Sequence, residues 1–204
     1  MIWLERKTAL LFSLILLSAF AFSCQSDTAG TDANSSFFDF SSDTEKAVEL
    51  VQAANDELRR IKILYNENQD TLKDLKEASQ KGESEKVKII SKTLVDTINT
   101  GFVFADSAKS KIREAQELNI HQDYKDYLGM KEQSLDKQVE AFQFLYDAAK
   151  LLSDTAGSQD KEQAEKARFV FKEKEENFQL KMEEAKKISA QADDLAKESM
   201  QRAK

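Results

Sequence analysis

Four stretches of the chain repeat apolar or small residues at alternating intervals of four and three, and this spacing constrains the fold most. The first row consists of Ala47, Val51, Ala54, Leu58, Ile61, Tyr65, Asn68, Leu72 and Leu75. A period of 3.5 residues puts such a row on one side of a helix that packs lengthwise against other helices. The chain has no proline and only five glycines among 204 residues, so few residues would interrupt long helices. The sequence therefore predicts an all-α fold.

Three further rows follow the same spacing, and each predicts one more long helix. The second row consists of Val87, Ser91, Leu94, Ile98, Gly101, Ala105, Ala108, Ile112 and Ala115. The third row consists of Tyr124, Leu128, Lys131, Leu135, Gln138, Phe142, Leu145, Ala149 and Leu152. The fourth row consists of Ala164, Ala167, Phe171, Lys174, Phe178, Met182, Ala185, Ile188, Ala192 and Leu195.

Local signals predict where these helices begin and end. Residues 42–45 have the S-x-x-E spacing of a capping box, in which side chains satisfy backbone N–H groups at a helix start. Gly82 and Gly157 stand where glycines commonly end a helix. Asp160 with Gln163 is expected to open the last helix.

The order of the rows predicts the architecture. The second and third rows are out of phase across residues 119–122, which predicts a turn there; one unbroken helix from 84 to 155 is the alternative. Short turns between long helices make sequence neighbours antiparallel. We therefore expect an elongated antiparallel up-down-up-down four-helix bundle with coiled-coil heptads over residues 43–204. Heptad rows serve bundles within and between chains equally, so the oligomeric state stays open.

The N-terminal segment has the pattern of a secretory signal peptide. Arg6 and Lys7 precede an apolar stretch from Ala9 to Phe22, which is shorter than the ~20 residues that cross a membrane as a helix. Positive residues, a short apolar stretch and then small residues are typical of export signals. Residues 1–23 are therefore expected to be a signal peptide, and the protein is expected to be exported.

The end of this stretch, from Ala21 through Phe22 and Ser23 to Cys24, resembles the lipobox of bacterial lipoproteins, in the relaxed form found in spirochaetes. The resemblance implies cleavage before Cys24 and attachment of acyl chains such as palmitate to this residue, which would hold the protein at a membrane. Gln25 follows in place of an aspartate, which implies the outer membrane if the cell is Gram-negative. Since the chain has no second cysteine, an ordinary thiol or a bond to another molecule are the other roles open to Cys24.

Residues 24–42 would link the anchor to the bundle. Ser, Asp, Thr, Ala, Gly and Asn prevail from Gln25 to Ser42, which predicts a flexible tether. Phe37, Phe38 and Phe40 are the exception in this polar segment. They would pack on one end of the bundle or dock on a partner or a membrane surface.

The sequence offers few groups for catalysis or metal binding. His121 is the only histidine, so neither a histidine-rich zinc site nor the paired Glu-x-x-His motifs of a di-iron bundle can be built. No P-loop, dinucleotide-binding, EF-hand or G-x-S-x-G motif occurs. We therefore expect no catalytic residue, cofactor or metal site, and we expect His121 to be a surface residue or a helix cap.

Polar residues in the rows and on the exposed faces have structural explanations. Four polar residues interrupt the rows: Asn68, Lys131, Gln138 and Lys174. Such a residue can fix the register of a helix, and a lysine can extend its ammonium group to water. Acidic residues four positions before basic ones predict ion pairs within helices. These are Asp56 with Arg60, Glu162 with Lys166, Glu183 with Lys187, and Asp193 with Lys197.

The net charge of −7 gives the chain no electrostatic reason to bind nucleic acid. We expect an envelope lipoprotein whose helical bundle has a structural role or binds an unidentified protein. A surface-exposed adhesin that binds a host is one alternative. A carrier is another, with a hydrophobic ligand held between the small residues Gly101, Ala105 and Ala108 and the inward aromatic residues; small side chains facing large ones in a filled core explain the same pattern.

Overall fold

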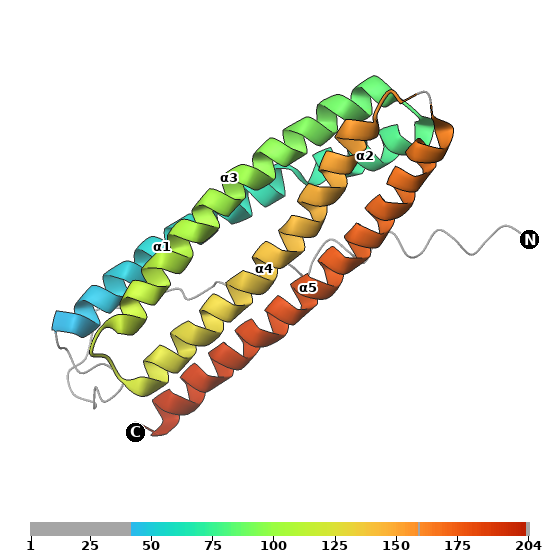
Figure 1. The fold of residues 1–204 in the computed structure, drawn as a ribbon. Helices are drawn as coiled ribbons and strands as arrows, with labels where there is room; N and C mark the ends of the chain where they lie inside the picture. Colours follow the sequence, from blue (N-terminus) through green and yellow to red (C-terminus); the bar gives the residue numbers. More distant parts are fainter. Residues whose placement is uncertain (1–41, 159, 203–204) are drawn as a thin grey trace, which may run out of the picture. The chain divides into compact units, whose positions relative to one another are not determined.

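The computed structural model describes residues 42–158 and 160–202, and these residues form helices and short connections without a strand. The helices are α1 (Ser42–Glu67), α2 (Gln69–Lys81), α3 (Ser84–Glu117), α4 (Gln122–Thr155) and α5 (Lys161–Arg202). They pack along one another as a helical bundle (Figure 1). The all-α prediction is therefore confirmed for this part of the chain.

The predicted signal peptide of residues 1–23, Cys24, and the tether through residue 41, including Phe37, Phe38 and Phe40, lie outside the described residues. Among the helices that are described, none has a stretch both long and apolar enough to span a bilayer.

The helix ends lie where the local signals predict. The first helix begins at Ser42. Gly82 and Gly157 follow α2 and α4 with φ of 70° and 85°, a left-handed conformation that side chains other than glycine rarely adopt. At the start of α5, Oδ1 of Asp160 accepts hydrogen bonds from the backbone N–H groups of Glu162 and Gln163, at 2.9 and 3.3 Å.

The turn predicted between the second and third rows is confirmed. Helix α3 ends at Glu117 and α4 begins at Gln122, so the alternative of one unbroken helix from 84 to 155 is wrong. Ile120 is buried within this turn. The backbone N–H of Asn119 donates to Oδ2 of Asp43 at 3.1 Å, which joins the turn to the start of α1.

The first predicted helix is interrupted at Asn68, which separates α1 from α2. The Nδ2 of Asn68 donates to the Leu64 carbonyl at 2.8 Å, and its backbone N–H is shared between the carbonyls of Leu64 and Tyr65, both at 3.2 Å. Asparagine disfavours the interior of a helix because its side chain competes for backbone hydrogen bonds. The expectation of a single first helix was therefore wrong at the polar residue of its row.

Two groups of buried side chains stabilise the bundle. The four-helix core draws on α2, α3, α4 and α5, with Leu75, Ala78, Val87, Leu94, Ile98, Ala141, Leu145, Ala148, Ala149, Leu152, Ala167, Phe171 and Phe178. The three-helix core draws on α1, α3, the turn and α4, with Ala47, Ala54, Ala105, Ala108, Ile112, Ala115, Ile120, Tyr124, Leu128 and Leu135. No described residue of α5 belongs to the three-helix core, so the second half of α5 needs other contacts.

Aromatic rings fill the interior where α1, α4 and α5 come together. The ring of Phe142 lies edge-on to Tyr65 at a centroid distance of 6.0 Å and edge-on to Phe178 at 5.5 Å. Edge-to-face contacts at these distances are favourable for aromatic pairs. The inward aromatic residues considered as the wall of a ligand cavity therefore contact one another.

Small residues recur every seven positions on α4, at Ser134, Ala141 and Ala148, and all three are buried. The hydroxyl of Ser134 donates to the backbone carbonyl of Ala185 on α5 at 2.8 Å. A hydrogen bond from a short side chain to the backbone of another helix requires the two helices to lie close together. Ala141 and Ala148 share the four-helix core with Phe171 and Phe178 of α5, so small residues leave room for large ones.

Enlarging one of these small residues should destabilise the bundle. We expect Ala141→Leu to lower the free energy of unfolding by about 1–3 kcal/mol, because added methylene groups in a filled core force neighbouring side chains out of position. Chemical denaturation of the full chain in detergent measures the change. Lys150→Leu, at an exposed position of α4, is the matched control and should change the unfolding free energy by less than about 0.5 kcal/mol. Equal effects of the two substitutions would contradict close packing at Ala141.

Candidate functional site

A network of hydrogen bonds and ion pairs, buried in part, joins α4 to the second half of α5, and we name it the α4–α5 polar seam. Its members are Asp123, Tyr127, Lys131 and Ser134 on α4 and Ser189, Asp193, Ser199 and Arg202 on α5. The buried residues of α5 in this half are all small: Ala185, Ser189, Ala192, Ala196 and Ser199. The distance between packed helices depends on the side chains at their contact. Small residues thus bring the polar groups of α4 and α5 within hydrogen-bonding distance.

Lys131 lies at the middle of the seam. Its Nζ donates to Oδ1 of Asp193 at 2.7 Å and to Oγ of Ser189 at 3.0 Å, and it lies 5.3 Å from the ring centroid of Tyr127. Only 10% of the Lys131 side chain is exposed, against 31% for Asp193. Lys131 therefore reaches across to α5 rather than out to water.

The expected ion pair between Asp193 and Lys197 is not formed. The sequence pairs Asp193 with Lys197, but Lys197 bonds Asp194 at 3.0 Å and Asp193 accepts from Lys131. Near the start of the chain Arg60 likewise bonds Glu57, three positions away, at 3.2 Å. Side chains three and four apart are both neighbours on a helix, so spacing alone does not choose the partner.

The acid–base properties of the seam suit a fixed contact. Burial raises the pKa of the Tyr127 hydroxyl, and the negative charge of Asp193 and the nearby Tyr124 raise it further. The phenol is therefore protonated at neutral pH. An ammonium group held by a carboxylate is a poor nucleophile, and a protonated phenol is a poor general base. The arrangement of Tyr127, Lys131 and Asp193 thus favours helix positioning over chemistry.

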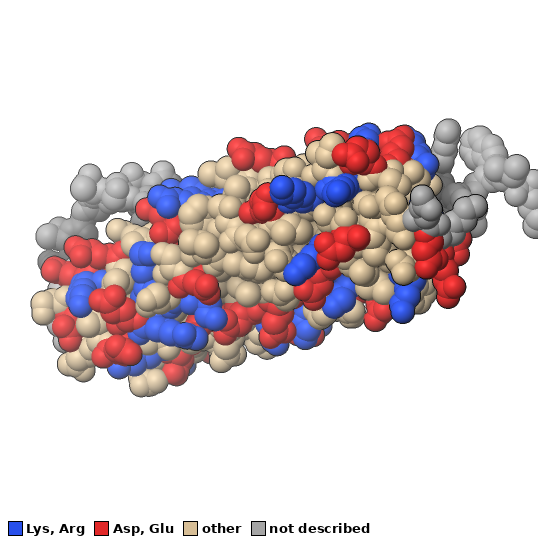
Figure 2. Space-filling view, turned by 45° about the horizontal axis from the view of Figure 1, so that its top comes forward, with Lys and Arg blue, Asp and Glu red and all other residues tan. Residues whose placement is uncertain are grey.

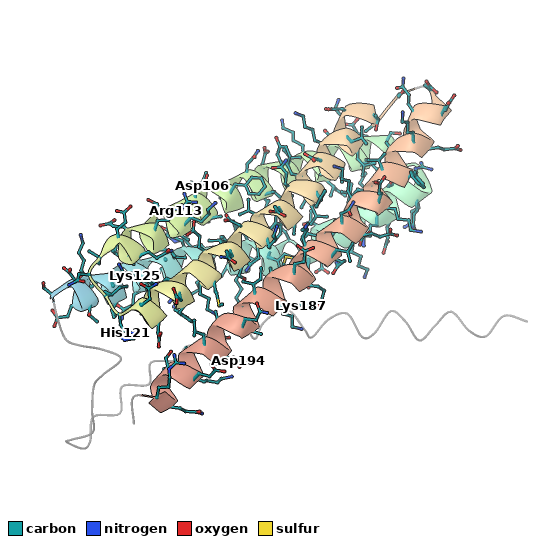
Figure 3. The ribbon with its side chains drawn as sticks, turned by 60° about the horizontal axis from the view of Figure 1, so that its bottom comes forward. Asp106, Arg113, His121, Lys125, Lys187 and Asp194 are labelled. Atoms are coloured by element: carbon teal, nitrogen blue, oxygen red, sulfur yellow. The ribbon has the colours of Figure 1, made fainter. Side chains whose placement is uncertain are left out.

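Asp123 joins the two helices at the C-terminal end of α5. Its Oδ2 accepts from Oγ of Ser199 at 2.7 Å and from Nη2 of Arg202 at 2.6 Å. The hydrogen bond from Ser199, followed by the one from Arg202, contributes most to lowering the pKa of the Asp123 carboxyl below its usual range. His121 lies beside it at the start of α4 (Figure 3), where Nδ1 accepts from the backbone N–H of Asp123 at 3.2 Å. The prediction that His121 is a helix cap is confirmed.

Lys174, the other lysine in the rows, also bonds across helices. Its Nζ donates to Oδ2 of Asp147 at 3.3 Å and lies 5.1 Å from the ring centroid of Phe144. Both lysines that interrupt the apolar rows therefore have a carboxylate and an aromatic ring of α4 or α5 as neighbours. Neither ammonium group is directed into an apolar cavity.

A shallow surface depression of about 390 Å³ lies along α3, where Figure 3 labels Asp106 and Arg113. Its other lining residues are Lys109, Ser110, Glu114 and Glu117. Two of its basic groups already bond carboxylates of α4: Arg113 donates to Glu132 at 2.5 Å, and Lys109 pairs with Asp136. In the described part of the chain, no cluster of three or more His, Cys, Asp or Glu residues is arranged to hold a metal ion.

Sequence reasoning missed the serines of the seam. Ser189 and Ser199 lie outside the fourth row, and Ser134 lies one position before Leu135 of the third row. A usable signal was present on α4, since Ser134, Ala141 and Ala148 repeat every seven residues beside that row. Such a repeat of small residues widens the buried face of a helix.

No known protein family, curated protein or solved structure gives a significant match to this chain.

Removing one partner of the central contact should destabilise the protein more than removing an exposed pair. We expect Asp193→Leu to lower the free energy of unfolding by about 1–3 kcal/mol, because it leaves the ammonium of Lys131 buried without its carboxylate. Adding Lys131→Met should restore most of this loss. The control is Lys197→Met at an exposed pair, with an expected loss below about 1 kcal/mol. Denaturant unfolding gives all four values, and a double variant as unstable as Asp193→Leu would contradict the coupling.

The hydrogen bonds to Asp123 should make the free energy of unfolding depend on pH. A carboxyl with a lowered folded pKa stabilises the protein above the unfolded pKa of about 4. This stabilisation is lost as the pH falls through the lower, folded pKa. Asp123→Asn should therefore reduce stability at pH 7 and flatten the loss of stability below about pH 4, measured by unfolding at a series of pH values. Asp106→Asn, at an exposed position of α3, is the control; an equal flattening there would show that the bonds to Asp123 are unimportant.

Proposed function

We propose that the protein is an exported lipoprotein of a bacterial envelope, held at a membrane by acyl chains on Cys24, with a helical bundle that binds another protein or has a structural role. The observation that carries the proposal is the placement of a single cysteine directly after a short apolar stretch with positive residues before it. More than one acyl chain is needed for stable anchoring, which the lipobox resemblance implies. Gln25 favours the outer membrane in a Gram-negative cell.

The finer architecture is part of the same proposal. Four helical segments, the first composed of α1 and α2, would run alternately up and down with heptad packing. Short connections support this arrangement, as do contacts that join distant residues. Ser199 near the end of α5 bonds Asp123 near the start of α4, and Lys174 bonds Asp147 further along. The buried residues of α3 also follow the second row, apart from Gly101.

The surface supports a role in binding protein rather than nucleic acid. Lys and Arg side chains alternate with Asp and Glu around an uncharged area on the face seen in Figure 2, whereas nucleic acid favours a basic patch. Large apolar side chains are exposed on α3 and α5, among them Val103 and Phe169. A contact with another protein would bury this exposed apolar area.

The alternatives differ in what they require. An adhesin requires the same anchor with the bundle outside the cell, so it is a special case of the proposal. A carrier requires space for a ligand, and the contacts of Phe142 with Tyr65 and Phe178 favour a filled interior. An enzyme requires a reactive group, and the lysines in the apolar rows are held by carboxylates. We therefore favour a non-enzymatic interaction or structural lipoprotein.

The test of the anchor is Cys24→Ser in the full chain. In the cell, wild-type protein should be labelled by radioactive palmitate, enter the detergent phase on phase partitioning and carry added acyl mass on its first residue. Cys24→Ser should lose the label and the acyl mass, because the hydroxyl cannot form the thioether. Ser26→Ala, two residues further on, is the control and should keep both. An unmodified thiol at Cys24 in wild-type protein would refute the proposal.

A further inference from the structure

The exposed outer face of α5 carries an ordered row of side chains that no contact within the bundle explains. The row consists of Glu162, Lys166, Phe169, Glu173, Glu176, Leu180, Glu183 and Lys187, and all eight are exposed. Lys187, labelled in Figure 3, lies on the side of α5 that is turned away from α4. The residues alternate in spacing by four and three, which keeps them on one helix face.

Two large apolar side chains belong to this row. Phe169 is 71% exposed and Leu180 is 62% exposed, while the inward residues Phe171 and Phe178 of the same helix are buried. A phenylalanine has roughly 150–250 Å² of surface to bury. These two side chains therefore give the outer face of α5 an apolar contact of its own.

We propose that this face binds the same face of a second copy of the chain, with the two α5 helices antiparallel. In an antiparallel pair centred between Glu173 and Glu176, Phe169 faces Leu180 of the second copy. Outside this contact, Lys166 faces Glu183 of the second copy, and beyond that Glu162 faces Lys187 of the second copy. A two-fold axis repeats each contact, so two apolar and four opposite-charge contacts form.

The charges of the row also select the direction of the second helix. In a parallel pair each residue meets its own equivalent, so that every charged position, from Glu162 to Lys187, would place like charges together. Like charges across helices are unfavourable and help to set orientation. The antiparallel pair has like charges only at its centre, between Glu173 and Glu176, where the neighbouring Lys172 can offset them.

The charged residues of this row form no salt bridge in the described part of the chain, although Lys187 interacts electrostatically with Glu184 on the same helix. Lys181 and Lys197 of α5 bond nearby carboxylates. By contrast, Glu162, Lys166 and Glu183 form no ion pair in the described part of the chain, and the helix pairs expected of them, with Lys187 as the fourth partner, are not formed. They are therefore available for contacts across a dimer.

The contact is modest in size. Residues 162–187 span about 38 Å of helix, and the two copies together contribute four large apolar side chains, two on each side of the central Glu173 and Glu176. Such a contact falls at the small end of the range for specific interfaces, so the dimer should form reversibly and increase with protein concentration. The inference does not depend on the lipid at Cys24.

Charge reversal tests the proposed contacts in the full chain in detergent, with Cys24→Ser to remove the influence of the anchor. Sedimentation velocity should show monomer and dimer, with the dimer increasing with concentration. Lys166→Glu or Glu183→Lys should each weaken dimerisation on the order of tenfold, because two attractive contacts become repulsive. The two substitutions together should restore it to within about threefold. Lys88→Glu, at an exposed position of α3, changes the net charge by the same amount as Lys166→Glu and should have no such effect.

Disulfide crosslinking tests the direction. In the Cys24→Ser chain, a mixture of Phe169→Cys and Leu180→Cys proteins should crosslink to each other more than either does to itself. A Cys24→Ser chain without further substitutions that stays monomeric at all concentrations would overturn the inference. So would a double charge reversal as weak as the single ones, or preferential crosslinking of Phe169→Cys to itself. Membrane association of the chain with Cys24 intact is measured separately, so failure of the dimer and failure of the anchor are distinguishable.

Discussion

Lys131 holds its ammonium group between Asp193 and Ser189 at the middle of the α4–α5 polar seam, and the register of the second half of the last helix depends on this contact. The fully buried residues of the second half of α5 are alanines and serines, which gain far less from leaving water than Leu or Phe; its larger apolar residues, such as Ile188 and Leu195, are only partly buried. Hydrophobic burial therefore holds this half weakly and without direction. Hydrogen bonds and the ion pair supply the direction, because each is satisfied in only one register of the two helices.

The two halves of α5 thus use different physical contacts. The first half places Phe171 and Phe178 in the four-helix core, where the large apolar area stabilises packing. The second half follows α4 through bonds from Lys131, Ser134 and Asp123. A buried ion pair adds little net stability once its loss of hydration is included, but removing one partner is unfavourable. The seam is therefore better suited to specifying an arrangement than to stabilising it.

Both sets of contacts use the inward side of α5, so its outer surface takes no part in them. The two lysines that interrupt the apolar rows bond within the bundle, Lys131 with Asp193 and Lys174 with Asp147, whereas Phe169 and Leu180 are exposed. A protein held at a membrane by an anchor meets its partners at high local concentration. A weak contact on one helix face can then be sufficient, which links the proposed anchor to the proposed association of two copies.

Much of the helical framework followed from short-range signals. The capping pattern at Ser42, the glycines after α2 and α4 and the phase change before His121 each act within one or two turns of backbone, so one sequence is enough to locate them. The apolar rows likewise indicated which faces are buried. The proposed lipid anchor at Cys24 rests on a local pattern of the same kind.

Partners across helices could not be foreseen in this way. Asp193 has basic residues near it in sequence, yet it bonds Lys131, and Ser134 finds its acceptor in the backbone of α5. Asn68, placed in a continuous row, interrupts the helix, and its side chain donates to the backbone carbonyl of Leu64. Each outcome depends on the rotation, spacing and register of whole helices, which are set when all the cores pack together. Local propensity carries no information about that arrangement, so only the folded bundle selects the partners of Asp193 and Ser134.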